Sequence, residues 1–274
     1  KNTRQITKAM ELVSASKMRR AQESAIKGRD YRNLALQLLT RLKQLTDVTK
    51  HPLYAVRPVA SRLHIVITSD RGLAGAYNSS VLKQFTKEVT SDRDESVVSH
   101  VLTIGRQGSN FVSRIEHVTS IGAYQDFPDH PTANDLRPIL DTVIEKFLAG
   151  EVDAVDITYT DFRSSIAQEV AVQRLLPAAF EAVAIDDDLA GATFEPNPNA
   201  VLASVTQRLV EVQLYKAILE SSASEQSSRM LAMKNASDNA GDIIDDLTLA
   251  FNTARQAAIT QELAEITGGA EAIA

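Results

Sequence analysis

Residues 199–266 read NAVLASVTQRLVEVQLYKAILESSASEQSSRMLAMKNASDNAGDIIDDLTLAFNTARQAAITQELAEI, and this stretch decides the architecture of the protein. It contains no proline and a single glycine, Gly241. Apolar residues recur along it at helical intervals, namely Val201, Val205, Leu209, Val212, Leu219, Met230, Met233, Ile243, Leu247 and Phe251. One continuous helix would rise about 1.5 Å per residue and form a rod of about 100 Å. A helix of that length needs a partner to cover its apolar side.

A second helical pattern covers residues 6–48, near the beginning of the chain. Its apolar positions are Ile6, Met10, Val13, Leu34, Leu38, Leu42 and Leu45, and the pattern ends before Pro52. Small residues on the C-terminal helix would allow close approach, namely Ala217, Ala223, Ala236, Ala240, Ala254 and Ala257. We therefore predict a long antiparallel coiled coil of the N- and C-terminal helices. The chain begins inside the helical pattern and without Met, so we expect a missing or processed beginning.

Between the two long helices, short β-branched runs typical of strands alternate with shorter segments of helical periodicity. Strands are predicted at 63–68, 97–104 and 155–159, an extended segment at 169–175, and helices at 79–89, 107–115 and 133–148. This alternation predicts a mostly parallel sheet in a Rossmann-like domain. The predicted fold class is thus α/β, with a coiled-coil helix at 1–58, the inserted Rossmann-like domain at 59–190 and a second coiled-coil helix at 191–274. An acidic, Pro-containing linker at 186–198 comes before the start of that second helical pattern, and we expect residues 60–190 to fold without the two helices.

Composition excludes several classes of site. There is no Cys among the 274 residues, which rules out disulfides and thiolate ligands within this chain. No apolar run approaches the roughly 20 residues of a membrane span. The net charge of -6 is unevenly distributed, because residues 1–50 contain 12 Lys and Arg against 4 Asp and Glu. This basic helix is typical of a solvated face, and nucleic acid, an anionic membrane or an acidic protein are its other interpretations.

The chemical motifs are incomplete. The turn SDRGLAGAYN at 69–78 lies between a strand and a helix, where phosphate-binding loops occur, but it lacks the third glycine of a dinucleotide site and the Gly-Lys-Ser/Thr of a P-loop. Acidic clusters at 186–188 and 242–246 have no His nearby, and no serine lies in a nucleophile elbow. We expect a tight turn, no catalytic, cofactor-binding or metal-binding residue, and no direct small-molecule substrate. A nucleotide-dependent enzyme and a nucleic-acid-binding protein are the alternatives to be tested.

Polar and small residues fill helical stretches at both ends of the chain, which indicates either a polar coiled coil or a rod in contact with other proteins. The relevant stretches are ITKAMELVSASKMRR at 6–20, SDRGL at 69–73, SEQSSRMLAM at 224–233 and RQAAITQEL at 255–263. Together they resemble, in the same order, the signature stretches of the gamma subunits of F-type ATP synthases. The family's first helix usually begins earlier. Family members often carry Cys where this chain has Ala74, so dithiol control is not expected.

The resemblance implies a rotor shaft. In the family, the terminal helices turn inside a hexamer of alpha and beta subunits, and the α/β domain contacts an epsilon-type subunit and the membrane c-ring. The implied partners are these subunits, with no nucleic acid, and the implied location is peripheral, on the cytoplasmic face of a bacterial membrane rather than an organellar one. Carried over by motif, the residues expected to contact the surrounding subunits are Lys8, Met10, Arg229, Arg255, Gln256 and Thr260.

Overall fold

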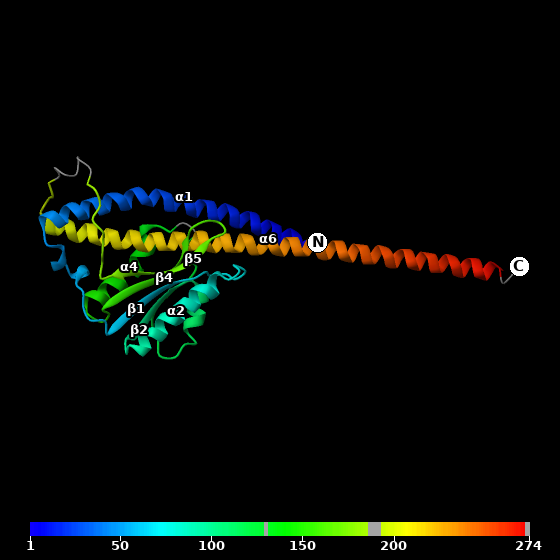
Figure 1. The fold of residues 1–274 in the computed structure, drawn as a ribbon, viewed down its shortest axis with the longest axis horizontal. Helices are drawn as coiled ribbons and strands as arrows, with labels where there is room; N and C mark the ends of the chain where they lie inside the picture. The colour runs from blue at the N-terminus through cyan, green and yellow to red at the C-terminus, as the bar shows by residue number, and fades with distance from the viewer. Residues whose placement is uncertain (129–130, 186–192, 272–274) are drawn as a thin grey trace.

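Two long helices run side by side, and an α/β domain is attached to one side of them (Figure 1). The computed structural model describes residues 1–128, 131–185 and 193–271. Helix α1 covers Asn2–Leu45 and helix α6 covers Pro198–Glu271. The hydroxyl of Thr46 lies 2.6 Å from Oδ1 of Asn199 at one end of the pair. At the other end Arg4 contacts Gly241, so the helices are antiparallel, as predicted.

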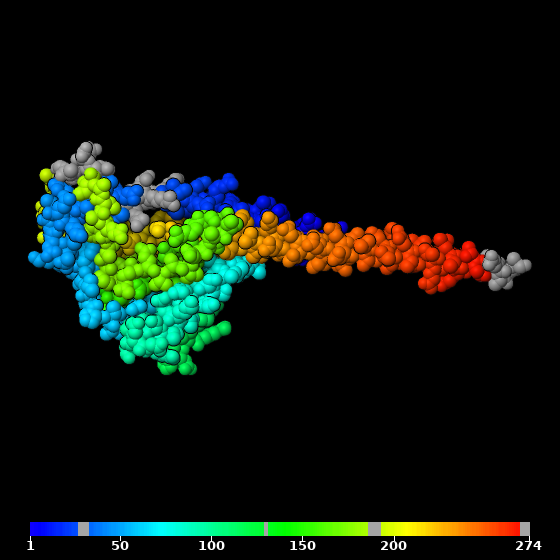
Figure 2. Space-filling view, in the orientation of Figure 1, coloured from blue at the N-terminus to red at the C-terminus, as the bar shows by residue number. Residues whose placement is uncertain are grey.

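Helix α6 is much longer than its partner. Because α1 begins opposite Gly241, residues 242–271 extend past α1 as a single helix, shown in orange and red in Figure 2. This segment is about 45 Å long at 1.5 Å per residue. Ala254 and Ala257 lie in it and are exposed, so the prediction that they pack against the first helix is wrong. Within the described residues no other helix lies beside these two alanines, so their small size allows no close helix contact.

The sheet has five strands in the order β3-β2-β1-β4-β5. The strands are β1 Ser61–Ile67, β2 Val98–Ile104, β3 Thr119–Tyr124, β4 Ala154–Phe162 and β5 Gln168–Leu176. The first four are parallel and β5 is antiparallel to β4, which confirms the predicted α/β class with a mostly parallel sheet. The helices of the domain are α2 Tyr77–Asp94, α3 Arg106–Val112 and α4 Ala133–Leu148, and two short 3₁₀ turns, Val48–Lys50 and Pro52–Tyr54, connect α1 to β1. Strand β3 was not predicted.

Helix α6 forms part of the domain core. Val210, Leu214, Ala217 and Ile218 are buried in the same cluster as the side chains of α4 and of one sheet face. On the other face, α2 packs through residues such as Phe85. The central strands β1 and β4 are thus buried along most of their length, and their polar members His64, Asp156 and Thr158 are buried with them. The expectation that residues 60–190 fold alone therefore has to include α6. Of the predicted linker at 186–198, residues 186–192 lie outside the described residues, and residues 193–197 lead into α6 without regular secondary structure.

Candidate functional site

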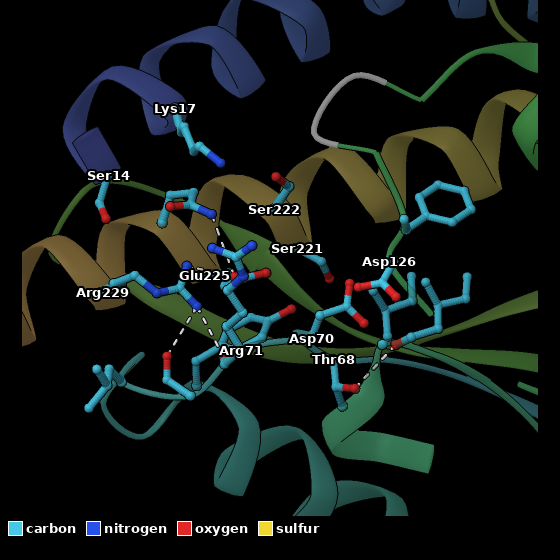
Figure 3. Close-up of a pocket in the computed structure, with 18 of the residues that line it drawn as sticks. Ser14, Lys17, Thr68, Asp70, Arg71, Asp126, Ser221, Ser222, Glu225 and Arg229 are labelled. Carbon is cyan, nitrogen blue, oxygen red and sulfur yellow. Dashed lines mark hydrogen bonds and ion pairs between the residues drawn. The ribbon is translucent and has the colours of Figure 1, made fainter. Parts of the chain in front are cut away.

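The strand order reverses at β1, which places the usual ligand crevice of such a sheet at the carboxyl ends of β1 and β4. In this protein α6 crosses that edge, and α1 lies beyond it (Figure 3). The crevice is thus bounded by the chain's own rod. What the edge can bind depends on which of its polar groups are still available.

The backbone amides at the start of α3 are already occupied. The amide of Arg106 donates to Oδ1 of Asp70 at 3.0 Å, and the amide of Gly108 donates to the hydroxyl of Thr68 at 2.8 Å. The amide of Gln107 donates to the carbonyl of Ser69 at 3.0 Å. Free amides at a helix start are what bind phosphate in nucleotide sites. Here a carboxylate, a hydroxyl and a carbonyl of the β1–α2 connection take that role.

The β1–α2 connection is a closed turn, as predicted. The amide of Ser69 donates to Oδ1 of Asn78 at 3.0 Å, and Nδ2 of Asn78 donates to Oγ of Ser69 at 2.8 Å. Two residues between them adopt the left-handed conformation, Leu73 with φ 63° and Gly75 with φ 56°. Leu73 is unusual because non-glycine residues rarely do so. Its side chain is 64% exposed at the tip of the turn.

Arg229 of α6 joins the rod to this turn. Its Nη2 donates to the carbonyls of Arg71 at 3.1 Å and of Gly72 at 3.3 Å, and its Nη1 lies 2.6 Å from a carboxylate oxygen of Glu225 (Figure 3). The residue is 8% exposed. Beneath it Tyr77 is buried, and this burial raises the pKa of the phenol.

Serines of α6 bind the hairpin between β4 and β5. The hydroxyl of Ser221 accepts from the amide of Thr160 at 3.2 Å, and the hydroxyl of Ser224 donates to the carbonyl of Thr160 at 3.3 Å. One turn further, Ser227 donates to the carbonyl of Ser165 at 2.7 Å. Their spacing of three places them on one helix face. The polar stretch at 224–233 is therefore partly buried against the chain's own domain, a role that the sequence analysis missed; the repeated serine spacing was the available signal.

A carboxylic acid pair lies beside these serines. Glu220 of α6 faces Asp161 of β4, with Lys216 at 3.4 Å from Glu220. Burial raises the pKa of the Glu220 carboxyl, and the charge of Asp161 raises it further, while Lys216 opposes both. Arg163 forms an ion pair with Asp161 at 2.8 Å. Glu220 is thus held in conditions that favour its protonated form.

A cavity of about 680 Å³ lies between α1, α6 and the β1–α2 turn. The acidic groups lining it are Asp70, Asp126 and Glu225, and the basic groups are Lys17, Arg71 and Arg229. Several of these charges are paired, including Arg229 with Glu225 and Asp126 with Arg106. A balanced lining of this kind does not select a polyphosphate. Among the described residues no group of three or more His, Asp and Glu is arranged to hold a metal ion.

The projecting part of α6 carries a series of exposed apolar residues that winds around the helix and is called here the apolar stripe. Its members are Ile243, Leu247, Phe251, Ile259, Leu263 and Ile266, each between 49% and 68% exposed. Large exposed apolar surfaces on soluble proteins mark contacts with other molecules. Arg255 is the single basic residue from 242 to 271, a segment that contains six Asp and Glu residues. No helix in the described part of the chain is both long and apolar enough to cross a bilayer.

Comparison with known proteins assigns the chain. The family described as ATP synthase matches residues 1–273. The ATP synthase gamma chain of Macrococcus caseolyticus is 39% identical over 274 residues, covering 100% of this chain and 95% of that protein. The gamma chain of Psychrobacter arcticus is 40% identical over 280 residues with the same coverage. This chain belongs to the ATP synthase gamma chain family.

Solved structures agree with this family membership. A chain in the cryo-EM structure of the Tetrahymena thermophila mitochondrial ATP synthase central stalk and c-ring matches with a TM-score of 0.65 and 29% identity, covering 85% of this chain and 99% of that one. A chain of the Euglena gracilis mitochondrial ATP synthase matches with a TM-score of 0.58 and 16% identity over 94% and 95% of the two chains, and shares the fold. The long rod with an attached α/β domain is thus a fold that this chain shares with chains of solved ATP synthases.

The six predicted contact residues of this gamma chain fall into three places. Met10 and Arg229 line the cavity, and Met10 is half-buried there. Lys8 is exposed on α1 and pairs with Glu11 at 2.9 Å. Arg255, Gln256 and Thr260 are exposed on the projecting helix. Arg229 differs from the other five, since its guanidinium is directed into the chain's own β1–α2 turn.

Proposed function

We propose that this gamma chain is the central rotor shaft of an F-type ATP synthase and catalyses no reaction itself. The observation that carries the proposal is the projecting segment 242–271, a helix with an apolar stripe and no covering partner in the described chain. A helix this exposed is stable only when other surfaces bury it. The collar of alpha and beta subunits implied by the family would supply such surfaces. The relatives named as ATP synthase gamma chains support this assignment.

The proposed mechanism is mechanical coupling. Ion flow turns the membrane ring, the ring turns the α/β domain, and α6 carries the rotation into the collar. A shaft changes the nucleotide affinity of a beta subunit only through contacts that differ between orientations. A single helix meets this requirement, because Arg255 and Gln256 point about 100° apart, with Thr260 on the same face as Gln256, so the two strips meet different subunits as the shaft turns. Lys8 and Met10, in the first turns of α1, are proposed to contact the surrounding subunits closer to the α/β domain.

The proposed partners follow the two ends of the molecule. The projecting helix enters the alpha and beta hexamer, and the α/β domain contacts an epsilon-type subunit and the c-ring. This arrangement corresponds to a peripheral protein on the cytoplasmic face of a bacterial membrane. The gamma chains of the bacteria Macrococcus caseolyticus and Psychrobacter arcticus, both similar to this chain, support a bacterial location.

The test is reconstitution with alpha and beta subunits from the same source. The three proteins should form one complex, and a bead attached to the α/β domain should rotate in one direction when ATP is added. A chain ending at residue 241 is the matched control, since it keeps the two-helix rod and loses the projecting helix; it should be retained less tightly. A chain that elutes alone, or a complex that hydrolyses ATP without rotation, would refute the proposal.

A further inference from the structure

One turn of α6 forms hydrogen bonds to two connections of the α/β domain, the β4–β5 hairpin and the β1–α2 turn. Ser227 donates to the carbonyl of Ser165 at 2.7 Å, and the hydroxyl of Ser228 donates to Oε1 of Gln168 at 2.6 Å. Both acceptors belong to the β4–β5 hairpin. The next residue, Arg229, donates to the carbonyls of the β1–α2 turn. We call Ser227, Ser228 and Arg229 the exit clamp, because α6 leaves the domain here.

The position of the exit clamp gives it leverage. Toward the N-terminal end of α6, the helix rests on the apolar core of the sheet. Beyond the clamp, only the beginning of α1 accompanies it, and from residue 242 onward it has no partner in the described chain. A small change of angle at the clamp is therefore multiplied along the projecting segment. Contacts at this point determine where the tip lies.

The contacts at the clamp are directional, whereas those of the core are not. Apolar packing is non-directional, so a helix can turn or slide slightly against it at low cost. Hydrogen bonds to backbone carbonyls on two different loops fix both the angle and the rotation of the helix. The planar guanidinium of Arg229 adds a fork that binds Arg71 and Gly72 together while Glu225 neutralises its charge.

The loop on the Arg229 side is itself held in a costly conformation. Leu73 has φ 63°, directly after the two carbonyls that Arg229 binds. Non-glycine residues stay in this conformation where surrounding contacts enforce it, and such residues gather at functional sites. A Cβ at Gly75, also left-handed, would lie 3.8 Å from the carbonyl of Ser228, so the turn packs closely against the clamp.

We propose that the exit clamp fixes the direction and rotational register of the projecting helix relative to the α/β domain. Arg229 is then a positioning residue and does not contact the catalytic subunits. This inference rests on the proposed function for its consequence, which is that a loosened clamp lets the domain turn without an equal turn of the tip. Its structural part, the fixed angle, can be tested on the chain alone.

The first experiment measures that angle in the full chain. Because the sequence has no Cys, spin labels at Ala76→Cys and Asp245→Cys are the only ones attached, and their distance distribution reports the angle between the β1–α2 turn and the beginning of the projecting segment. We expect the distribution to widen roughly two-fold in Arg229→Gln, because this variant removes the two hydrogen bonds that join the clamp to the β1–α2 turn and leaves the two to the β4–β5 hairpin. Arg208→Gln, an exposed position on the same helix, is the control and should leave the width unchanged.

A milder variant keeps the test decisive if Arg229→Gln folds poorly. Ser228→Ala removes one bond from a half-buried position and should widen the distribution less, and Arg229→Lys should fall between wild type and Gln because it keeps the charge and loses the fork. Equal widths in folded wild type, Arg229→Gln and Ser228→Ala would overturn the proposal. In the reconstituted synthase, clamp variants should keep ATP hydrolysis and lose proton pumping. Absence of rotation in wild type would instead count against the proposed function.

Discussion

A carboxylate oxygen of Asp70 lies 3.0 Å from the backbone nitrogen of Arg106 and accepts its hydrogen bond. An internal anion therefore occupies the start of α3, at the edge of the sheet where related folds bind phosphate. We predict that the isolated chain binds neither ATP nor NAD and hydrolyses no ATP. Isothermal calorimetry should show no stoichiometric heat with either nucleotide. A saturable site near one per chain would contradict this account of the turn.

Gly105, the residue before α3, should tolerate no side chain. Its φ is 99°, and an added Cβ would lie 2.2 Å from the carbonyl oxygen of Thr68. We expect Gly105→Ala to lower the free energy of unfolding by roughly 3 kcal/mol or more, since strain and steric overlap combine. Gly72→Ala is the matched control, because no atom lies within 4 Å of its added Cβ, and it should change stability by less than about 0.5 kcal/mol. Urea unfolding measures both.

The α/β domain should require α6 for its own stability. Val210, Leu214 and Ile218 are buried in its core, and each contributes about 1.5–3 kcal/mol on burial, a sum comparable to the 5–15 kcal/mol of a typical domain. We expect residues 59–190 alone to retain secondary structure and lose fixed packing, seen as loss of the near-ultraviolet circular dichroism signal. The same fragment joined to residues 198–230 should regain it. A cooperative unfolding transition in the shorter fragment would show that α6 is dispensable.

Arg255 and Gln256 are predicted to affect coupling without affecting folding. Both are exposed on the projecting helix, and adjacent helical positions point about 100° apart, so together they reach two strips of a surrounding collar. Replacing both by Ala should leave assembly with alpha and beta subunits intact. ATP-driven proton pumping in vesicles should fall several-fold, because a hydrogen bond to a charged group contributes about 1.5–3 kcal/mol.

The control for this pair is Thr86 and Lys87, which are adjacent and exposed on α2 of the domain. Their double replacement by Ala should leave pumping unchanged. If the variant at Arg255 and Gln256 pumps and hydrolyses as wild type does, these residues are ordinary solvated helix positions.

Glu220 should make stability depend on pH. Burial raises the pKa of its carboxyl above the ordinary 4.5, with Asp161 adding to the shift and Lys216 opposing it. The folded state therefore holds this proton more tightly than the unfolded state does. The corresponding stability is fully present below pH 4.5 and is lost as the pH rises through the raised pKa. Tyr159, with its pKa also raised by burial, and Arg163 are the other titratable groups facing the pair.

Glu220→Gln cannot ionise, so its free energy of unfolding should decrease less than that of wild type between about pH 4 and about pH 8. Glu262→Gln, at an exposed position on the projecting part of the same helix, is the control variant. If the free energies of unfolding of wild type and Glu220→Gln change in parallel with pH, the pKa of the Glu220 carboxyl is not raised by folding.

The sequence predicted the elements that depend on local periodicity. Helix α4 is predicted at 133–148 and occurs there, and β1, β2 and β4 overlap the strands predicted from short β-branched runs. Strand β3 was missed because it is a half-exposed edge strand that contains Gly122 and polar residues, so its pattern is weak. The position of Arg229 could not be read from the sequence, since a buried arginine differs from a solvated one only through carbonyls contributed by a distant turn.

The uninterrupted course of α6 also constrains how the family can vary in length. Inserting one residue between the exit clamp and Arg255 would swing everything beyond it by about 100° around the helix axis and push it about 1.5 Å outward. A seven-residue insertion would bring the side chains back to within about 20° of their original facing. The rotational position of the segment around the helix axis is therefore set by the number of residues that separate it from the clamp. Length changes that approximate whole numbers of turns preserve which side of the tip meets a given neighbour, and other length changes do not.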